Sequence, residues 1–190
     1  MTTIWETRND MIKYYCNKSK ILEIGVFKGE FLDYIVNNCD YVSVDGVDLF
    51  EGATGSGDVD GNNFTMCNLE KSFLDLSEKY KENPAIRIIK SNSNSFLQSQ
   101  KDDSYDIIYI DADHSYEGTK HDLINSFNKI KDGGYIMGHD YEMNMNKAKQ
   151  YYNFGVKQAV EEFCINYKQT ILSKAMDGCV SFCIHINKTS

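Results

Sequence analysis

Carboxylates and imidazoles gather in two stretches of this 190-residue sequence, each directly after an apolar run. DIIYI precedes Asp111, Asp113 and His114, and YIMG precedes His139 and Asp140. If the two runs are neighbouring strands, their ends lie about 4.8 Å apart. Carboxylates that close repel each other unless one is protonated or a cation lies between them. Such an oxygen-rich set suggests Mg²⁺, and the added histidines would also tolerate Mn²⁺ or Fe²⁺. The alternative is a pair of surface loops with solvated charges.

A glycine-containing turn is expected at the end of another apolar run, in ILEIGVFKGEF. Glu23 stands where the dinucleotide-binding pattern G-x-G-x-x-G has its first glycine, and a carboxylate there would repel a pyrophosphate. This argues against NAD and favours a positively charged cofactor without phosphate, such as S-adenosylmethionine with its sulfonium and ammonium groups. Glu23, Gly25 and Gly29 are therefore candidate cofactor-binding residues. The alternative is a tight strand-to-helix turn that binds no ligand.

A second acidic residue is expected at the end of the second strand, where it would bind the ribose hydroxyls of the cofactor. Asp48 fits this position. Asp45 is the rival, but it falls inside the strand, where an unpaired charge is costly. After the third strand comes SNSNS, in which Asn92 and Ser93 could meet the adenine edge. A run of this composition is also typical of a plain loop.

A frame of strands and helices has to bring these residues together, and the apolar pattern predicts one. Short apolar runs predict strands at 20–24, 41–47, 86–90, 106–110, 135–138, 170–174 and 180–186, with a turn at 131–134. Helical spacing predicts helices at 4–17, 29–38, 68–82, 94–100, 118–131 and 155–167. Strands that alternate with helices indicate a parallel sheet covered on both faces. The last two strands are joined by too few residues for a crossover helix, so they are expected to pair antiparallel.

Composition limits the class of protein. The length is typical of one domain, 1–190, with its own core. A net charge of −8 and the lack of any basic cluster argue against nucleic acid or an anionic membrane as partner. No apolar run is long enough to span a membrane, and the first ten residues lack a signal-peptide pattern, so a cytoplasmic protein is expected. Six cysteines without a CxxC pair are interpreted as reduced thiols.

Taken in order along the chain, the motifs resemble the class I S-adenosylmethionine-dependent methyltransferases. The likeness is strongest to the group of macrocin-type and aminocoumarin-sugar O-methyltransferases, with cephalosporin hydroxylase-like proteins nearby. The residues that carry it are LEIGVFKGEF, GVDLFEG, DIIYIDADHSYEGTKHDL, GGYIMGHDY and GVKQAVEEF. The resemblance implies an α/β fold with a Rossmann-like, doubly wound, seven-stranded sheet, mostly parallel with an antiparallel last strand.

The resemblance also implies roles for individual residues. Asp111, His139 and Asp140 would hold a divalent metal, most simply Mg²⁺, and Asp111 would also face the cofactor. Asp113 is the candidate general base, with His114 as second choice. Members of the group often have two adjacent acidic residues where this chain has His139 and Asp140. The aromatic-rich segment 141–154 is expected to help shape the acceptor pocket, or else to be an ordinary solvent-facing segment.

The leading functional hypothesis is metal-assisted O-methylation of a small hydroxylated, sugar-like acceptor by S-adenosylmethionine. Two alternatives stay open. In the first, His114, His139 and a carboxylate form the iron site of a non-haem oxygenase of the cephalosporin hydroxylase-like type. In the second, the chain is a methyltransferase-like binding subunit without turnover. The expected partner is a small molecule, and a homo-oligomer is left open.

Overall fold

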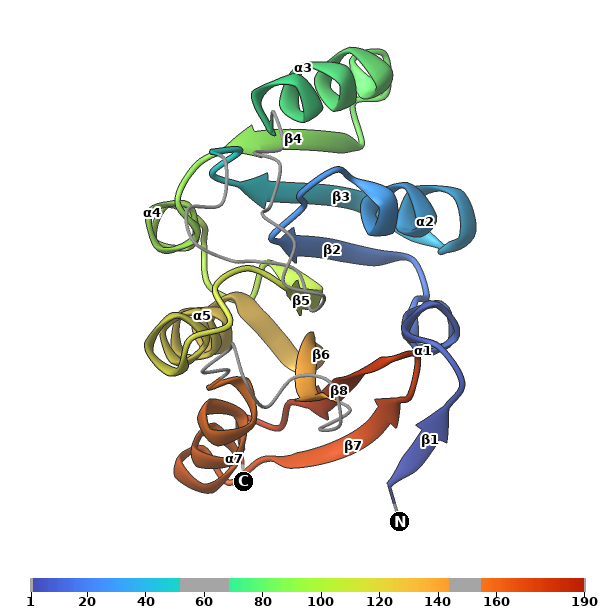
Figure 1. Cartoon of the computed structure of the whole chain (residues 1–190). Coiled ribbons are helices and arrows are strands. Elements are labelled where there is room, and N and C mark those ends of the chain that lie inside the picture. The colour runs from blue at the N-terminus through green and yellow to red at the C-terminus, as the bar shows by residue number, and fades with distance from the viewer. Residues whose placement is uncertain (1, 52–68, 144–154, 190) are drawn as a thin grey trace.

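The computed structural model describes residues 2–51, 69–143 and 155–189. Within these ranges eight strands form one sheet in the order β1-β7-β8-β6-β5-β2-β3-β4 (Figure 1). The strands are β1 (Thr3–Trp5), β2 (Ser19–Ile24), β3 (Tyr41–Asp48), β4 (Ile86–Lys90), β5 (Tyr105–Ile110), β6 (Ile130–Met143), β7 (Thr170–Ala175) and β8 (Cys179–His185). The helices are α1 (Arg8–Tyr15), α2 (Glu30–Asn38), α3 (Leu69–Tyr80), α4 (Ser93–Ser99), α5 (Tyr116–Lys129) and α7 (Val156–Asn166). Most of the segment 141–154 lies outside the described residues.

The predicted α/β fold class is confirmed. Strands β2 to β6 pair in parallel, and β8 runs antiparallel to both of its neighbours, β6 and β7. The hairpin of the last two strands therefore forms as the short connection between them required. Seven of the strands correspond to the seven that the sequence predicted, and the N-terminal β1 adds an eighth at the edge beside β7.

The prediction of a single helix over 4–17 was wrong at its beginning. Trp5 instead lies in β1, opposite Ala175 of β7, and α1 begins only at Arg8. Thr7 sets that boundary, because its side chain accepts a hydrogen bond from the backbone N–H of Asp10 and so caps the helix. The helical spacing in the sequence extends to residues before Thr7, but the capping side chain of Thr7 makes the helix begin at Arg8.

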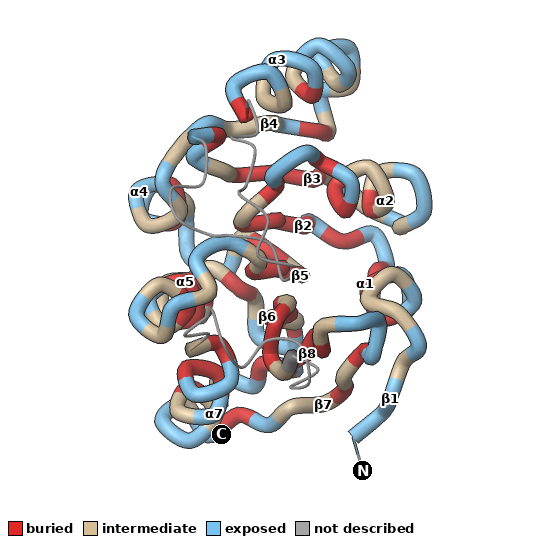
Figure 2. Tube along the Cα trace, in the orientation of Figure 1, coloured by how far each residue is buried: buried red, intermediate tan, exposed pale blue. Residues whose placement is uncertain are grey.

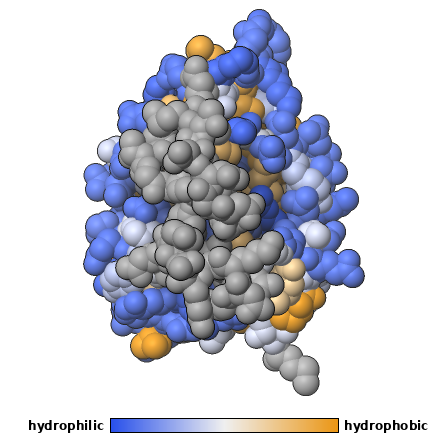
Figure 3. Space-filling model, in the orientation of Figure 1, coloured by the Kyte–Doolittle hydropathy of each residue, from blue (hydrophilic) through white to orange (hydrophobic). Residues whose placement is uncertain are grey.

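Two apolar clusters hold the sheet between two layers of helices. Leu22 and Ile24 face the cluster shared with α4, α5 and α7, and Ile21 faces the cluster shared with α1, α2 and α3. Figure 2 shows the resulting pattern, with buried strands between helices whose outer sides are exposed. In Figure 3 the described residues visible on this side of the molecule are mostly hydrophilic, with apolar groups in separate patches. None of the described helices could span a membrane.

Strand β6 is longer and less regular than the sequence predicted. The turn expected at 131–134 belongs to this strand, because Gly133 and Gly134 exchange backbone hydrogen bonds with Ile186 just beyond β8. Further along, Gly138 pairs with Phe182 and Glu142 with Val180, so four steps along β6 match two along β8. This is a β-bulge, a feature that redirects side chains where a regular strand would alternate them.

Candidate active site

A cavity of about 760 Å³ opens at the carboxyl ends of β2, β3 and β5, where ligands bind in open α/β sheets. Most residues that the sequence singled out line it: Glu23, Gly25, Asp48, Asn92, Ser93, Asp111, Asp113 and His114. Three others, Gly29, His139 and Asp140, are not among its lining residues. The structure thus brings the two sequence motifs and the glycine turn to one edge of the sheet.

The glycines of the turn after β2 are explained by packing inside the protein. A Cβ atom on Gly25 would lie 2.0 Å from the backbone oxygen of Asp111, and the residue has a left-handed φ of 91°. Gly29 also has a positive φ, and a Cβ there would meet the side chain of Leu76 on α3. Both positions therefore require glycine, but only Gly25 faces the cavity.

Glu23 is a buried carboxyl group beneath this turn. Its residue is 2% exposed, and among the described residues its Oε2 atom has no hydrogen-bond partner. Burial raises the pKa of Glu23 well above its usual range, the charge of Asp111 adds to the rise, and Arg8 opposes it. A cationic group in the cavity would offset the cost of burying this carboxylate. The buried carboxyl group of Glu23 therefore fits the positively charged ligand that the sequence favours.

The two candidate acids on β3 lie in different surroundings. Asp45 is buried, forms two hydrogen bonds with the guanidinium of Arg87, and accepts a third from the hydroxyl of Tyr105. It does not line the cavity. Asp48 does, and its two oxygens accept backbone N–H groups from Phe27 and Phe50. Because each carboxylate oxygen can accept more than one hydrogen bond, Asp48 retains acceptor capacity toward a ligand.

The segment after β4 is shaped by caps and by a residue that the sequence analysis missed. The side chain of Asn92 caps α4 by accepting the N–H groups of Asn94 and Ser95. Ser93 donates its hydroxyl to Asp122 of α5 over 2.7 Å. Asp122 lines the cavity but is only 3% exposed. Only its place in the amphipathic helix, among residues expected to be buried, could have suggested a role.

The pKa of Asp122 leads to a test of stability against pH. Burial raises this pKa to about 6, from 3.8 in the unfolded chain, so stability should fall as the pH rises from about 4 to about 6. Asp122→Asn, which keeps the acceptor for Ser93, should stabilise the protein by roughly 2–3 kcal/mol at pH 7.5. The gain should nearly vanish near pH 4. Urea unfolding at both pH values measures it, with the exposed Asp40→Asn as control, and an equal gain at both would contradict the prediction.

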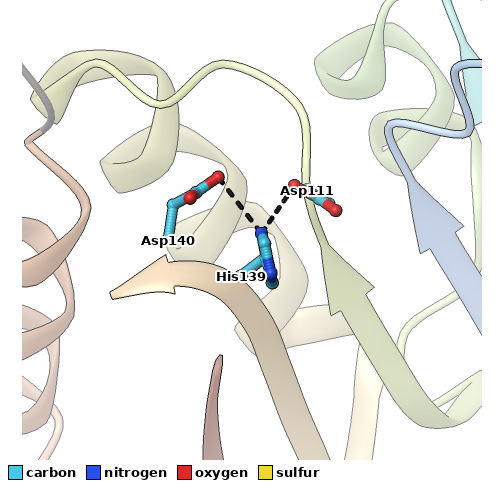
Figure 4. Close-up of side chains that lie close together, drawn as sticks. All are labelled: Asp111, His139 and Asp140. Atoms are coloured by element: carbon cyan, nitrogen blue, oxygen red, sulfur yellow. Dashed lines mark ion pairs between the residues drawn. The ribbon is translucent and has the colours of Figure 1, made fainter. Parts of the chain in front are cut away.

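Asp111, His139 and Asp140 converge at the ends of β5 and β6 (Figure 4). The Nδ1 atom of His139 lies 3.2 Å from Oδ2 of Asp140 and 3.9 Å from Oδ1 of Asp111. One donor atom of each residue lies within 4.8 Å of the others. Successive strand residues normally point to opposite faces. Here the bulge in β6, with a left-handed φ of 56° at Asp140, brings both neighbours to Asp111.

His114, the second choice as base, lies in the same cluster. Its Nε2 atom is 3.2 Å from Asp111 and 3.1 Å from Asp140. Burial lowers the pKa of His114, but the hydrogen bond to Asp111 and the charges of Asp140 and Asp111 outweigh it and raise the pKa overall. Asp113, the first choice as base, instead accepts the backbone N–H of Ser115 at the start of α5. Asp113 lines the cavity without a described contact to the cluster.

Arg8, at the start of α1, is a further charged group that the sequence analysis missed. It donates to Oδ2 of Asp111 over 3.1 Å, on the other side of that carboxylate from His114. Its guanidinium stacks over the ring of Phe31, 4.7 Å from the centroid. No motif surrounds Arg8, and more than a hundred residues separate it from Asp111. Its proximity follows only from the way α1 packs beside β7 and α2.

The donor set and the cavity fit the groups that the sequence suggested. Two carboxylates and an imidazole are ligands that Mg²⁺, Mn²⁺ and Fe²⁺ accept. A cavity of about 760 Å³ lies within the usual range for small-molecule sites. The unpartnered Glu23 oxygen suits the cationic part of an adenosyl cofactor, and Asp48 suits its ribose.

Comparison with known proteins gave a family and a set of similar folds. A family model described as a methyltransferase domain matches residues 22–141. A search of the curated proteins gave no match. Among solved structures, the N-methyltransferase NodS from Bradyrhizobium japonicum WM9 is similar with a TM-score of 0.60 at 12% identity, over 89% of this chain and 86% of that one.

Two further structures are described as O-methyltransferases. One, from Bacillus cereus and in complex with S-adenosylhomocysteine (SAH), has a TM-score of 0.60 at 14% identity, over 94% of this chain and 78% of that one. The other, an O-methyltransferase family protein from Burkholderia thailandensis, has a TM-score of 0.61 at 8% identity, over 90% of this chain and 51% of that one. At these identities the similarity concerns the fold.

Proposed function

The chain belongs to the methyltransferase domain family that matches its residues 22–141, and from this premise we propose that it methylates a hydroxyl of a small, sugar-like acceptor. S-adenosylmethionine would be the methyl donor. The observation that carries the proposal is the arrangement of the cavity. Glu23, whose Oε2 atom has no partner in the described part of the chain, and the acceptor-rich Asp48 would form its cofactor side. Asp111 would join that side to the cluster of His114, His139 and Asp140.

In the proposed reaction an oxygen lone pair of the acceptor attacks the methyl carbon of the donor. The carbon–sulfur bond breaks, the sulfonium becomes the thioether of SAH, and the hydroxyl proton leaves to a base. Because the sulfonium is reactive by itself, the protein contributes mainly alignment and proton removal. Asp48 would hold the ribose, Glu23 would face the cationic end of the donor, and Asn92 and Ser93 would border the adenine.

The Asp111–His139–Asp140 cluster would hold a divalent ion, Mg²⁺ in the first instance, which when bound lowers the pKa of a coordinated hydroxyl. Between the two candidate bases, the contacts of His114 with Asp111 and Asp140 support it over Asp113. Asp113 accepts the backbone N–H of Ser115, the N-cap residue of α5, so its contribution would be positioning of the loop that carries His114.

The family match does not favour the alternative of a non-haem iron oxygenase. The O-methyltransferase from Bacillus cereus is described in complex with SAH, and the similar fold of this chain supports an adenosyl cofactor here. A binding subunit without turnover would share that cofactor site. Only the formation of methylated product distinguishes an enzyme from such a binding subunit.

SAH is expected to stabilise the folded chain. Ligand at a hundredfold excess over its Kd adds about 2.7 kcal/mol, which corresponds to a rise in Tm of roughly 5–10 °C for a protein of this size. Differential scanning fluorimetry measures the shift. Mass spectrometry of reactions with S-adenosylmethionine and a library of hydroxylated acceptors then detects methylated product. Lack of any SAH effect would contradict the proposal, and a shift without product across the library would favour the binding subunit.

A further inference from the structure

The charged side chains around the cavity are predominantly acidic. Eight of its lining residues are aspartate or glutamate, whereas Arg8 and Lys28 are the arginine and lysine among the described lining residues. This imbalance suits the cationic sulfonium and ammonium of the proposed donor. The same donor also carries an α-carboxylate, which needs a cation or several N–H donors. A site built from carboxylates alone would repel that end of the molecule.

Of the two cations, Arg8 is the one held in place. Its side chain is 26% exposed, and it is fixed by the hydrogen bond to Asp111 and by stacking on Phe31. The backbone N–H of Arg8 donates to Asp177, which anchors the start of α1. Lys28 is exposed, and its ammonium lies over the equally exposed ring of Phe27. An ordered guanidinium binds with a smaller loss of side-chain freedom than an exposed lysine.

The position of Arg8 also matches the polarity of an amino acid. Arg8 and Glu23 line the same cavity and influence each other electrostatically. Arg8 presents five N–H donors, of which one serves Asp111 and another interacts with the hydroxyl of Tyr109, so donors remain for a ligand. Glu23 offers an oxygen without a described partner. A cation beside an anion is the arrangement that binds an α-carboxylate next to an α-ammonium.

We propose that Arg8 binds the α-carboxylate of the methyl donor, beside Glu23, and so selects cofactors that carry an amino-acid end. This inference rests on the proposed function. It assigns the N-terminal helix α1, which lies outside the matched residues 22–141, a direct part in the cofactor site. The competing explanation is that Arg8 only neutralises Asp111 and affects every ligand alike.

Two ligands separate these explanations. SAH carries the amino-acid end, and 5′-methylthioadenosine has the same adenosine and thioether without it. In calorimetric titrations, Arg8→Met is expected to weaken SAH binding about 10–100-fold, the loss typical of a charge-assisted hydrogen-bonded pair. Affinity for 5′-methylthioadenosine should be unchanged. Methionine keeps an unbranched apolar chain over Phe31, and Lys28→Met serves as the matched control with no expected change for either ligand.

Arg8→Lys provides a second variant, because it keeps the charge and loses the planar fork of donors. It should weaken SAH binding less than Arg8→Met and again spare 5′-methylthioadenosine, and it decides the question if the methionine variant does not fold. Equal losses for both ligands, or no loss for SAH, would overturn the inference while leaving the proposed function in place. If the unmodified protein bound neither ligand, both the proposed function and this inference would be overturned.

Discussion

Asp140→Asn is expected to lower methyl transfer by about 10²–10³-fold, because an ion at this cluster contributes several kcal/mol of charge stabilisation and each 1.4 kcal/mol is tenfold in rate. The substitution removes one of the two carboxylates that face the ion site. Cofactor affinity should be almost unchanged, because Asp140 is not among the proposed donor contacts, which lie on α1, β2, β3 and the loop after β4. Initial rates with an acceptor that the protein methylates measure methyl transfer, and SAH titrations measure cofactor affinity.

Asparagine at residue 140 can adopt the backbone conformation that Asp140 has in the structure. Asp140 has a φ of 56°, and asparagine is one of the few residues that tolerates that conformation. Asp103 has nearly the same φ, 54°, and is exposed on the surface, so Asp103→Asn controls for the backbone alone and should be fully active. EDTA should reproduce the effect of Asp140→Asn. Full activity in EDTA, with no metal found by elemental analysis, would refute metal assistance and leave His114 as a base acting without an ion.

The two acids of β3 should respond in opposite ways to substitution. Asp48→Ala removes the acceptor for the ribose hydroxyls, and two charge-assisted hydrogen bonds correspond to a loss of SAH affinity of roughly 10²-fold or more. Its effect on stability should be smaller than that of Asp45→Ala, because the hydrogen bond from the N–H of Phe27 is exposed and the one from the N–H of Phe50 is only partly buried.

Asp45→Ala should instead destabilise the fold by about 1–3 kcal/mol, because it leaves the buried hydroxyl of Tyr105 without its acceptor. The loss stays below that of a fully buried ion pair, because the side chain of Arg87 is 56% exposed and can turn to water. SAH affinity, measured at a temperature where the variant is folded, should not change. Denaturant unfolding and calorimetry give both values, and the reverse pattern would identify Asp45 as the ribose-binding residue.

The sequence was sufficient to predict what depends on apolar periodicity and on strand order. Runs such as DIIYI and YIMG form buried strands side by side, so the prediction that Asp111 and Asp140 lie close together follows from the register of β5 and β6. The prediction that Asp48 rather than Asp45 binds the ribose rested on its place at the strand end. Asp48 lines the cavity and Asp45 does not, and ribose binding stays a prediction. Binding of the cofactor and of the metal ion stays a prediction.

What could not be predicted depends on local geometry and on contacts distant in sequence. The bulge that turns His139 and Asp140 to the same side was not predicted, although an isolated glycine within a strand, such as Gly138, often marks one. Arg8 reaches Asp111 only through the packing of α1, and Asp122 reaches Ser93 only because α5 lies beside α4. Gly29 had the spacing of a binding glycine, yet its constraint is the side chain of Leu76.

The bulge in β6 also bears on the thermodynamics of ligand capture. Pairing with β8 is regular up to Gly138 and resumes at Glu142. His139 and Asp140 therefore belong to a segment that is held at both ends by strand pairing. Ligands on a free loop lose conformational entropy when they close around an ion, whereas a preorganised pair has already lost it on folding. The strain of the left-handed backbone at Asp140 therefore lowers the stability of the fold. It does not make the free energy of ion binding less favourable at each turnover.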